Sequence, residues 1–142
     1  MRRKSSSSKR GSAIVEMALL SPWIFFLFVG ALDWGFYAYS LITLENATRT
    51  AALYESQQTT TTSVTSSGAC TMVLYEMSTL INMGSVTSCS SSPLVVSAST
   101  DTATDGANEA IVSATYTTPQ MIPVPGVLSG KFTITRTVKM KM

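Results

Sequence analysis

The sequence contains no histidine and only two cysteines among its 142 residues. Histidine is the commonest general base and the commonest metal ligand, so the residue that usually performs acid–base catalysis or binds a metal is absent. Two cysteines do not complete a structural zinc site, which usually takes four Cys and His ligands. The sequence also shows no nucleophile next to a base and no phosphate-binding loop. We therefore predict a protein that is not an enzyme, with no catalytic residues, no metal site and no cofactor.

Charge is scarce as well, and it is unevenly distributed. Charged residues make up 13% of the chain and apolar residues 45%. The net charge is +2, but five of the ten bases lie in the first ten residues, namely Arg2, Arg3, Lys4, Lys9 and Arg10. The remaining chain has five bases against eight acids, a net charge of −3. A short basic tip on an acidic body argues against nucleic-acid binding.

One long apolar run follows the basic tip. Residues 12–32 contain a single charged side chain, Glu16. About 20 apolar residues in a helix, each rising about 1.5 Å, cross a bilayer core of about 30 Å. The basic flank predicts that the N-terminus stays in the cytoplasm and that the body is exported. The run therefore predicts a single membrane span.

Three interpretations of this run compete. A cleaved secretory signal with a site near residues 29–31 is disfavoured because the run is longer than the usual apolar core of about 7–15 residues. A plain membrane anchor explains the length but not Glu16, since a carboxylate in lipid costs a few kcal/mol. Cleavage after Gly11 would explain the presence of Glu16, because the new amine of Ser12 would then lie four residues from the Glu16 carboxylate. The two charges would pair within a chain or between neighbours.

The residues from Gly11 to Leu20, Gly-Ser-Ala-Ile-Val-Glu-Met-Ala-Leu-Leu, resemble the processing and assembly region of type IV pilin-like proteins. The chain is most similar to the TadE-like family, the minor pseudopilins of tight-adherence (Flp) pilus systems. The resemblance continues through Pro22, Asp33-Trp34-Gly35 and the alanine-rich residues 46–52. Met17 departs from the aromatic residue common at its position, and Leu53 replaces a frequent second arginine, which puts a paired-arginine motif in doubt.

The resemblance implies a role and a set of partners. A prepilin peptidase would cut after Gly11, and Glu16 would guide packing of the subunit in a filament used for adhesion or secretion. The partners would be the bacterial inner membrane, the assembly platform and other pilin or pseudopilin subunits. The subunit would span the inner membrane once, with a periplasmic body, and become extracellular after assembly. The alternative is an uncleaved single-span protein that displays a Ser/Thr-rich binding domain on the surface.

Beyond the apolar run, the helical pattern continues. Tyr37, Leu41, Leu44, Thr48 and Ala51 recur at steps of three and four residues, which marks one face of a helix. No glycine or proline interrupts residues 36–57. We predict one helix over residues 12–57, kinked at Pro22, where the backbone lacks a donor and crowds the carbonyl of Ala18. Asp33 is expected near the membrane–water boundary or against a neighbouring subunit.

The next segment is rich in hydroxyl side chains. Serine and threonine supply 23 of the 49 residues from 56 to 104, which predicts mostly exposed loops. An exception is an amphipathic helix expected over residues 69–83, ended by Gly84. Cys70 and Cys89 would lie in an oxidising compartment and are predicted to form a structural disulfide. Closing this loop contributes about 3 kcal/mol in the chain-entropy model.

The last third is predicted to form strands. Residues 94–100, 110–117 and 131–142 are β-rich, and the last alternates most clearly, with Arg136 interrupting its apolar face. Asp105-Gly106 is a turn pair; Asp101 and Asp105 are left open as a weak cation site. We predict an α+β, type IV pilin-like fold: a long N-terminal helix, transmembrane in its first half, packed on a small antiparallel sheet of about three strands. The expected divisions are a leader at 1–11, the helix at 12–57 and an exported domain at 58–142.

Overall fold

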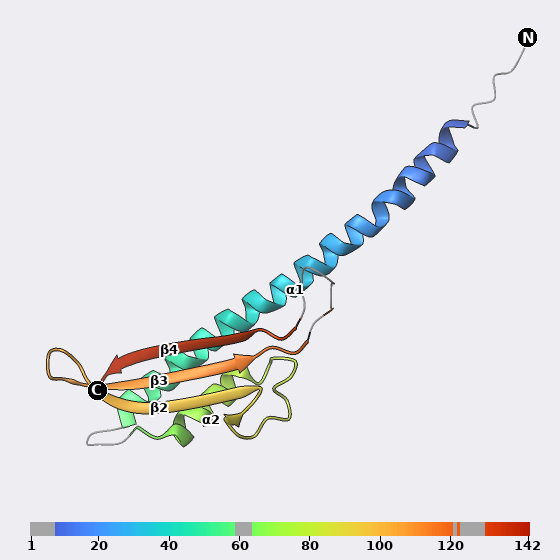
Figure 1. Cartoon of the computed structure of the whole chain (residues 1–142). Helices are drawn as coiled ribbons and strands as arrows, with labels where there is room; N and C mark the ends of the chain where they lie inside the picture. The colour runs from blue at the N-terminus through green and yellow to red at the C-terminus, as the bar shows by residue number, and fades with distance from the viewer. Residues whose placement is uncertain (1–7, 59–63, 121, 123–129) are drawn as a thin grey trace, which may run out of the picture. The chain divides into compact units, whose positions relative to one another are not determined.

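The computed structural model describes residues 8–58, 64–120, 122 and 130–142 (Figure 1). The chain divides into two compact units, Met1–Phe36 and Tyr37–Met142, which are described here one at a time. The first long element, α1 (Ser8–Gln58), contributes to both. The predicted long helix is therefore confirmed, and it begins four residues earlier than expected. It runs through Pro22 without a break in helical structure.

The second unit contains one antiparallel sheet of four strands in the described residues. These are β1 (Ser90–Ser91), β2 (Leu94–Thr102), β3 (Asn108–Thr117) and β4 (Thr133–Lys141), in the order β1-β2-β3-β4. The three predicted strands are confirmed, and the two-residue β1 was not predicted. Gly106, at φ +83°, supplies the left-handed turn between β2 and β3 that a residue with a side chain rarely adopts.

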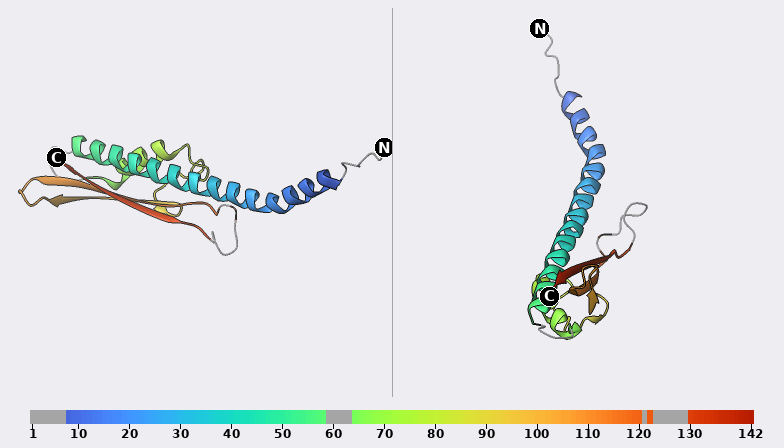
Figure 2. Two further views of the ribbon diagram at one scale, coloured as in Figure 1. Left: turned by 90° about the horizontal axis from the view of Figure 1, so that it is seen from above. Right: turned by 90° about the vertical axis from the view of Figure 1, so that its left-hand side faces the viewer.

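One face of this sheet packs on the second half of α1 and on α2 (Ser66–Met77), as Figure 2 shows. Alternation puts every second side chain of β3 into the core, and α1 meets the sheet with mainly small residues. The buried members of the core include Leu44, Ala47, Ala51, Ala52, Val73, Met77, Leu94, Val112, Ala114 and Tyr116. The α+β prediction, with the helix against an antiparallel sheet, is therefore confirmed.

The short helix differs from its prediction at both ends. α2 spans Ser66–Met77 instead of residues 69–83. Beyond Met77 the chain continues in tight turns, in which the N–H groups of Leu80, Met83 and Val86 each donate to the carbonyl three residues earlier. Bonds at this spacing bring side chains three residues apart to one side. Met77, Leu80 and Met83 therefore remain buried although the α-helix has ended.

A buried polar pair fixes these turns to the sheet. The hydroxyl of Tyr116, on β3, donates to Oδ1 of Asn82, and Nδ2 of Asn82 donates to the carbonyl of Thr117 at 3.3 Å. Tyr116 has no solvent exposure, so its hydroxyl requires a partner inside the protein. Burial raises the pKa of Tyr116 above its ordinary value, and the hydrogen bond to Asn82 partly opposes that rise.

Of the proline-rich segment after β3, Met121 and Val124 lie outside the described residues. Ile122 is described, and half of its surface is exposed.

Candidate assembly and processing site

The predicted cleavage point lies in the first turn of α1. Gly11 is the fourth residue of the helix, and Ser12 follows it with an exposed side chain. The first four N–H groups of a helix have no partner within it, so this turn opens more easily than the interior. Glycine adds to this, because it costs about 1 kcal/mol relative to alanine inside a helix. The bond between Gly11 and Ser12 is thus placed where the backbone opens at low cost.

Glu16 lies one turn beyond this bond. Its Oε1 accepts a hydrogen bond from Oγ of Ser12 at 3.3 Å. Glu16 has no ion-pair partner within the described part of the chain. The two residues therefore face each other at the i, i+4 spacing that the sequence suggested. An amine created at Ser12 would lie within reach of the same carboxylate.

The residues on either side of Glu16, from Ile14 to Phe28, expose large apolar side chains on all sides of the helix. Ile14, Trp23 and Leu27 are each at least 70% exposed. The other exposed apolar side chains of this stretch include Leu19, Leu20, Ile24, Phe25, Phe26 and Phe28. A helix that is apolar all round belongs in lipid or in the interior of an assembly. Within the described residues, α1 is the one helix with the length and composition to cross a membrane.

Pro22 and Asp33 also lie in this first unit. Pro22 removes one backbone donor, so the carbonyl of Ala18 loses its ordinary helical partner, yet α1 continues past it. Asp33 has no hydrogen-bond partner for either carboxylate oxygen among the described residues. Both interpretations of Asp33, at the membrane boundary or against another subunit, remain predictions.

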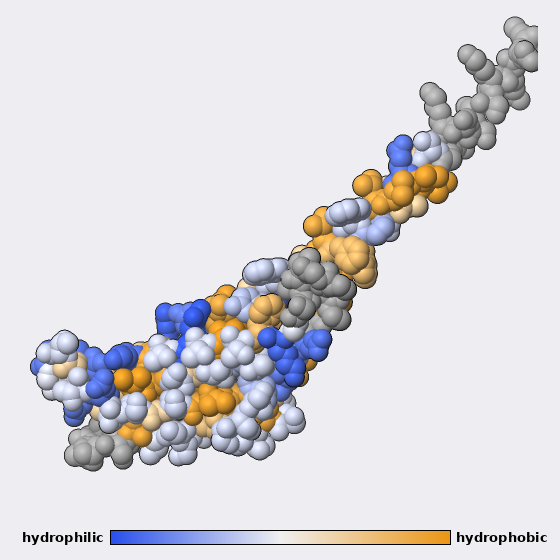
Figure 3. Space-filling view, in the orientation of Figure 1, coloured by the Kyte–Doolittle hydropathy of each residue, from blue (hydrophilic) through white to orange (hydrophobic). Residues whose placement is uncertain are grey.

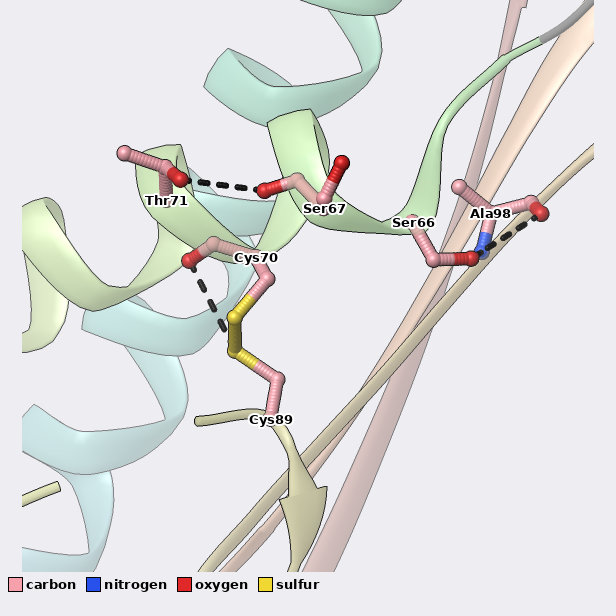
Figure 4. The surroundings of a disulfide bond; sticks show 6 residues. All are labelled: Ser66, Ser67, Cys70, Thr71, Cys89 and Ala98. Carbon is pink, nitrogen blue, oxygen red and sulfur yellow. Dashed lines mark hydrogen bonds between the residues drawn. A yellow bond between two sulfur atoms is a disulfide. The ribbon is translucent and has the colours of Figure 1, made fainter. Parts of the chain in front are cut away.

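The predicted disulfide between Cys70 and Cys89 is present, with a Cα–Cα distance of 5.8 Å (Figure 4). It joins α2 to the segment directly before β1. Close to it, Oγ of Ser66 accepts the N–H of Ala98 at 3.2 Å, so α2 is also tied to β2. These residues belong to the second unit and have a structural role there.

Asp101 and Asp105, left open as a cation site, each lie beside a lysine. Asp105 pairs with Lys141 and accepts the N–H of Ala107, and both bonds lower its pKa, the first more than the second. Asp101 lies 3.8 Å from Nζ of Lys139. No cluster of potential metal ligands occurs among residues with described positions. Each of the two carboxylates therefore already has a cationic side chain beside it.

One buried acid escaped the sequence reasoning. Glu55, near the end of α1, is 3% exposed, and its Oε2 accepts the N–H of Thr65 at 2.9 Å. The carboxylate therefore caps the start of α2, where the helix dipole favours negative charge. Gly68 makes room for it, since a Cβ there would lie 2.3 Å from Oε1 of Glu55. The signal was available: Glu55 extends the buried stripe of Leu44, Thr48 and Ala51 by one further turn.

The comparisons with known proteins give one match. A family model described as TadE-like protein matches residues 11–53. No curated protein and no solved structure matches the chain. The matched segment begins at Gly11 and includes Glu16, Pro22, Asp33-Trp34-Gly35 and the alanine-rich stretch, so the resemblance predicted from these residues is confirmed.

Proposed function

From this TadE-like segment we propose that the chain is a minor pilin or pseudopilin subunit of a tight-adherence pilus system. It is inserted in the inner membrane by the first half of α1, with the basic tip in the cytoplasm and the second unit in the periplasm. The observation that supports the proposal is the start of the family match at Gly11, directly before an apolar stretch, residues 12–32, whose one charge is Glu16.

In this function a prepilin peptidase hydrolyses the bond after Gly11 and removes the five bases of the leader. The subunit keeps its apolar helix, which then leaves lipid for the interior of a filament together with the helices of other pilin subunits. The new amine of Ser12 and the carboxylate of Glu16 neutralise each other in an environment with little else to solvate them. The assembly platform in the inner membrane and the peptidase are the remaining partners.

The test is the mature N-terminus. The full chain is expressed with and without a prepilin peptidase, extracted in detergent and analysed by intact-mass and N-terminal peptide spectrometry. We expect a start at Ser12 only when the peptidase is present, and an intact start with the Gly11→Ala variant. A start at residue 1 in the presence of an active peptidase would favour the uncleaved surface protein, and a start near Asp33 would favour a secreted one.

A second measurement separates processing from assembly. Glu16→Gln should be cleaved normally but should incorporate poorly into pili, because the amine of Ser12 then has no counter-charge. Glu76→Gln, at an exposed position of α2, is the matched control and should incorporate like the unmodified chain. Normal incorporation of the Glu16→Gln subunit would remove the assembly role from this residue.

A further inference from the structure

The sheet has one open edge in the described structure. β4 is the outermost strand and pairs only with β3, over nine consecutive residue pairs from Glu109 with Lys141 to Thr117 with Thr133. The opposite edge is different, because β1 pairs with the start of β2 and Oγ of Ser66 accepts the N–H of Ala98 beyond it. These neighbours of β2 therefore cover that edge of the sheet as far as Ala98, while β4 has no such cover among the described residues.

Two hydrogen bonds beyond the ends of β4 show which of its backbone groups point outward. The N–H of Met142 donates to the carbonyl of Asn108 at 3.0 Å, and the carbonyl of Phe132 accepts the N–H of Thr118 at 2.8 Å. In an antiparallel pair every second residue exchanges both bonds with the partner strand. Even-numbered residues of β4 therefore bond to β3, and the odd-numbered residues direct their N–H and C=O groups to the open edge. These are Thr133, Thr135, Thr137, Lys139 and Lys141, all of them exposed.

This edge carries only one interruption. Nη1 of Arg136 donates to the carbonyl of Thr135 at 3.4 Å, and no other described group bonds to an outward carbonyl or N–H of the strand. β4 contains no proline and no glycine, and its pairing with β3 shows no bulge. Edge strands with such regular backbones accept a further strand readily unless charge opposes it.

The charge of this edge defines what it would accept. Four of the five bases after residue 11 lie in the last twelve residues, namely Lys131, Arg136, Lys139 and Lys141. The same segment contains no acid. Lys139 lies 3.8 Å from the exposed Asp101 and 4.0 Å from the partly buried Glu109, and Lys141 pairs with the exposed Asp105. Ion pairs this close to the surface contribute little, so an incoming carboxylate can exchange with them. Neither Lys131 nor Arg136 takes part in an ion pair within the described residues.

We propose that the open edge of β4 binds an extended, acidic segment of another protein, which joins the sheet as an additional strand. The outward backbone groups provide the hydrogen bonds, and the cationic side chains select carboxylates on the incoming strand. A second copy of β4 is the wrong partner, because it would bring the same cations to the same edge. The site lies in the second unit and does not depend on cleavage at Gly11.

The side chains of β4 also set a register for the partner. On one face of the sheet, the partner strand should place an acid opposite Arg136 and apolar residues opposite Ile134 and Val138. On the other face, the partner strand should place acids opposite Lys139 and Lys141 and threonines opposite the threonines of β4. An antiparallel peptide that satisfies these positions reads Glu-Val-Glu-Val-Thr-Glu-Thr-Val-Thr, with its first residue opposite Lys141.

The experiment measures binding of this fluorescent peptide to the full chain in detergent micelles by anisotropy. We expect a Kd below about 1 mM at low salt, weakening as salt is added. The matched peptide with glutamine at each glutamate should bind about tenfold more weakly. The acidic peptide N-methylated at its third, fifth and seventh residues should not bind, because those amides face β4.

Two variants of the protein separate backbone pairing from simple charge attraction. Thr135→Pro removes an outward N–H and the hydroxyl that bonds to Oγ1 of Thr115 on β3, but no backbone bond to β3, so it should lower affinity at least about tenfold. Thr135→Val removes the same hydroxyl and keeps the N–H, so it should bind like the unmodified chain. Arg136→Gln should lower affinity for the acidic peptide and leave the affinity for the glutamine peptide unchanged. Circular dichroism checks that each variant keeps its sheet.

Several results would overturn the proposal. Absence of peptide binding at about 1 mM would do so, as would equal binding of the N-methylated peptide. If Thr135→Pro folds and binds normally, the contact does not involve the backbone of this edge. If a peptide with the sequence of β4 binds more tightly than the acidic peptide, the edge pairs with a second copy of this chain, and the proposal of an acidic partner is wrong.

Discussion

The two halves of α1 have the same helical backbone but differ in their side chains. Ile24, in the first half, and Ile42, in the second, are each 58% exposed. Around Ile24 the exposed neighbours are large and apolar, whereas Ile42 shares its surface with Asn46 and Arg49. The first half therefore presents a mostly apolar surface, in which orange patches alternate with paler ones in Figure 3, and the second half presents a mixed one.

The buried faces of the two halves differ as well. In the second half the buried positions are mostly small, and Ala47, Ala51 and Ala52 have no exposure. Small residues let the sheet and α2 approach the helix backbone closely. The first half instead exposes large apolar side chains, among them Trp23, Phe26 and Leu27, so it is suited to lipid or to other helices. One secondary structure thus serves two environments because side-chain size and polarity change along it.

The largest effect is expected when a charge is placed on the apolar first half of α1. Ile24→Arg should reduce membrane insertion by about a hundredfold, because arginine at a span centre costs about 3 kcal/mol. Ile42→Arg starts from the same residue at the same exposure and should insert normally. Alkaline carbonate extraction of membranes measures both. Equal extraction of the two variants would contradict the assignment of the first half as the span.

A smaller effect is expected from added volume. Ala51→Leu places three more carbons in a position with no free surface, and should lower the free energy of unfolding by about 2 kcal/mol. Ala31→Leu makes the same change at an exposed position of the first half. Urea unfolding of the detergent-solubilised chains, followed by circular dichroism, tests the pair. A tolerated leucine at residue 51 would mean that α1 and the sheet are less closely packed than described.

The smallest effect concerns the polar pair beneath the sheet. Tyr116→Phe should lower the free energy of unfolding by about 1 kcal/mol, because Asn82 loses its donor. Since burial raises the pKa of Tyr116, the folded state holds the phenolic proton more tightly than the unfolded state. Stability should therefore fall as pH rises above the ordinary tyrosine pKa of about 10, and it should fall less in the variant. Tyr75→Phe, at an exposed site, should show neither change; an identical pH profile for Tyr116→Phe would contradict the argument.

The sequence predicted the features that depend on local pattern. Alternation in residues 131–142 identified β4, the recurrence of Tyr37, Leu41 and Leu44 identified the buried face of α1, and the order of Gly11, Glu16 and Pro22 identified the TadE-like segment. The features it missed depend on contacts between distant residues. The cap that Glu55 provides to α2 and the bond of Tyr116 to Asn82 both join residues whose proximity only the folded chain reveals.

The end of the short helix was missed for a different reason. Met77, Leu80 and Met83 keep a spacing that fits both an α-helix and successive tight turns, so the apolar pattern alone did not distinguish them. Both backbone conformations bury side chains at this spacing. The hydrogen bonds to the carbonyl three residues earlier decide between the two.

The strand order β1-β2-β3-β4 follows the order of the chain, and this has a consequence for how the sheet forms. Each strand pairs with the one that precedes it, so no strand must wait for a later one before it finds its neighbour. Pairings that are local in sequence close with little loss of chain entropy and form quickly. Because a chain is synthesised from its N-terminus, the strands can pair in sequence, and β4 is the last of the four to join the sheet.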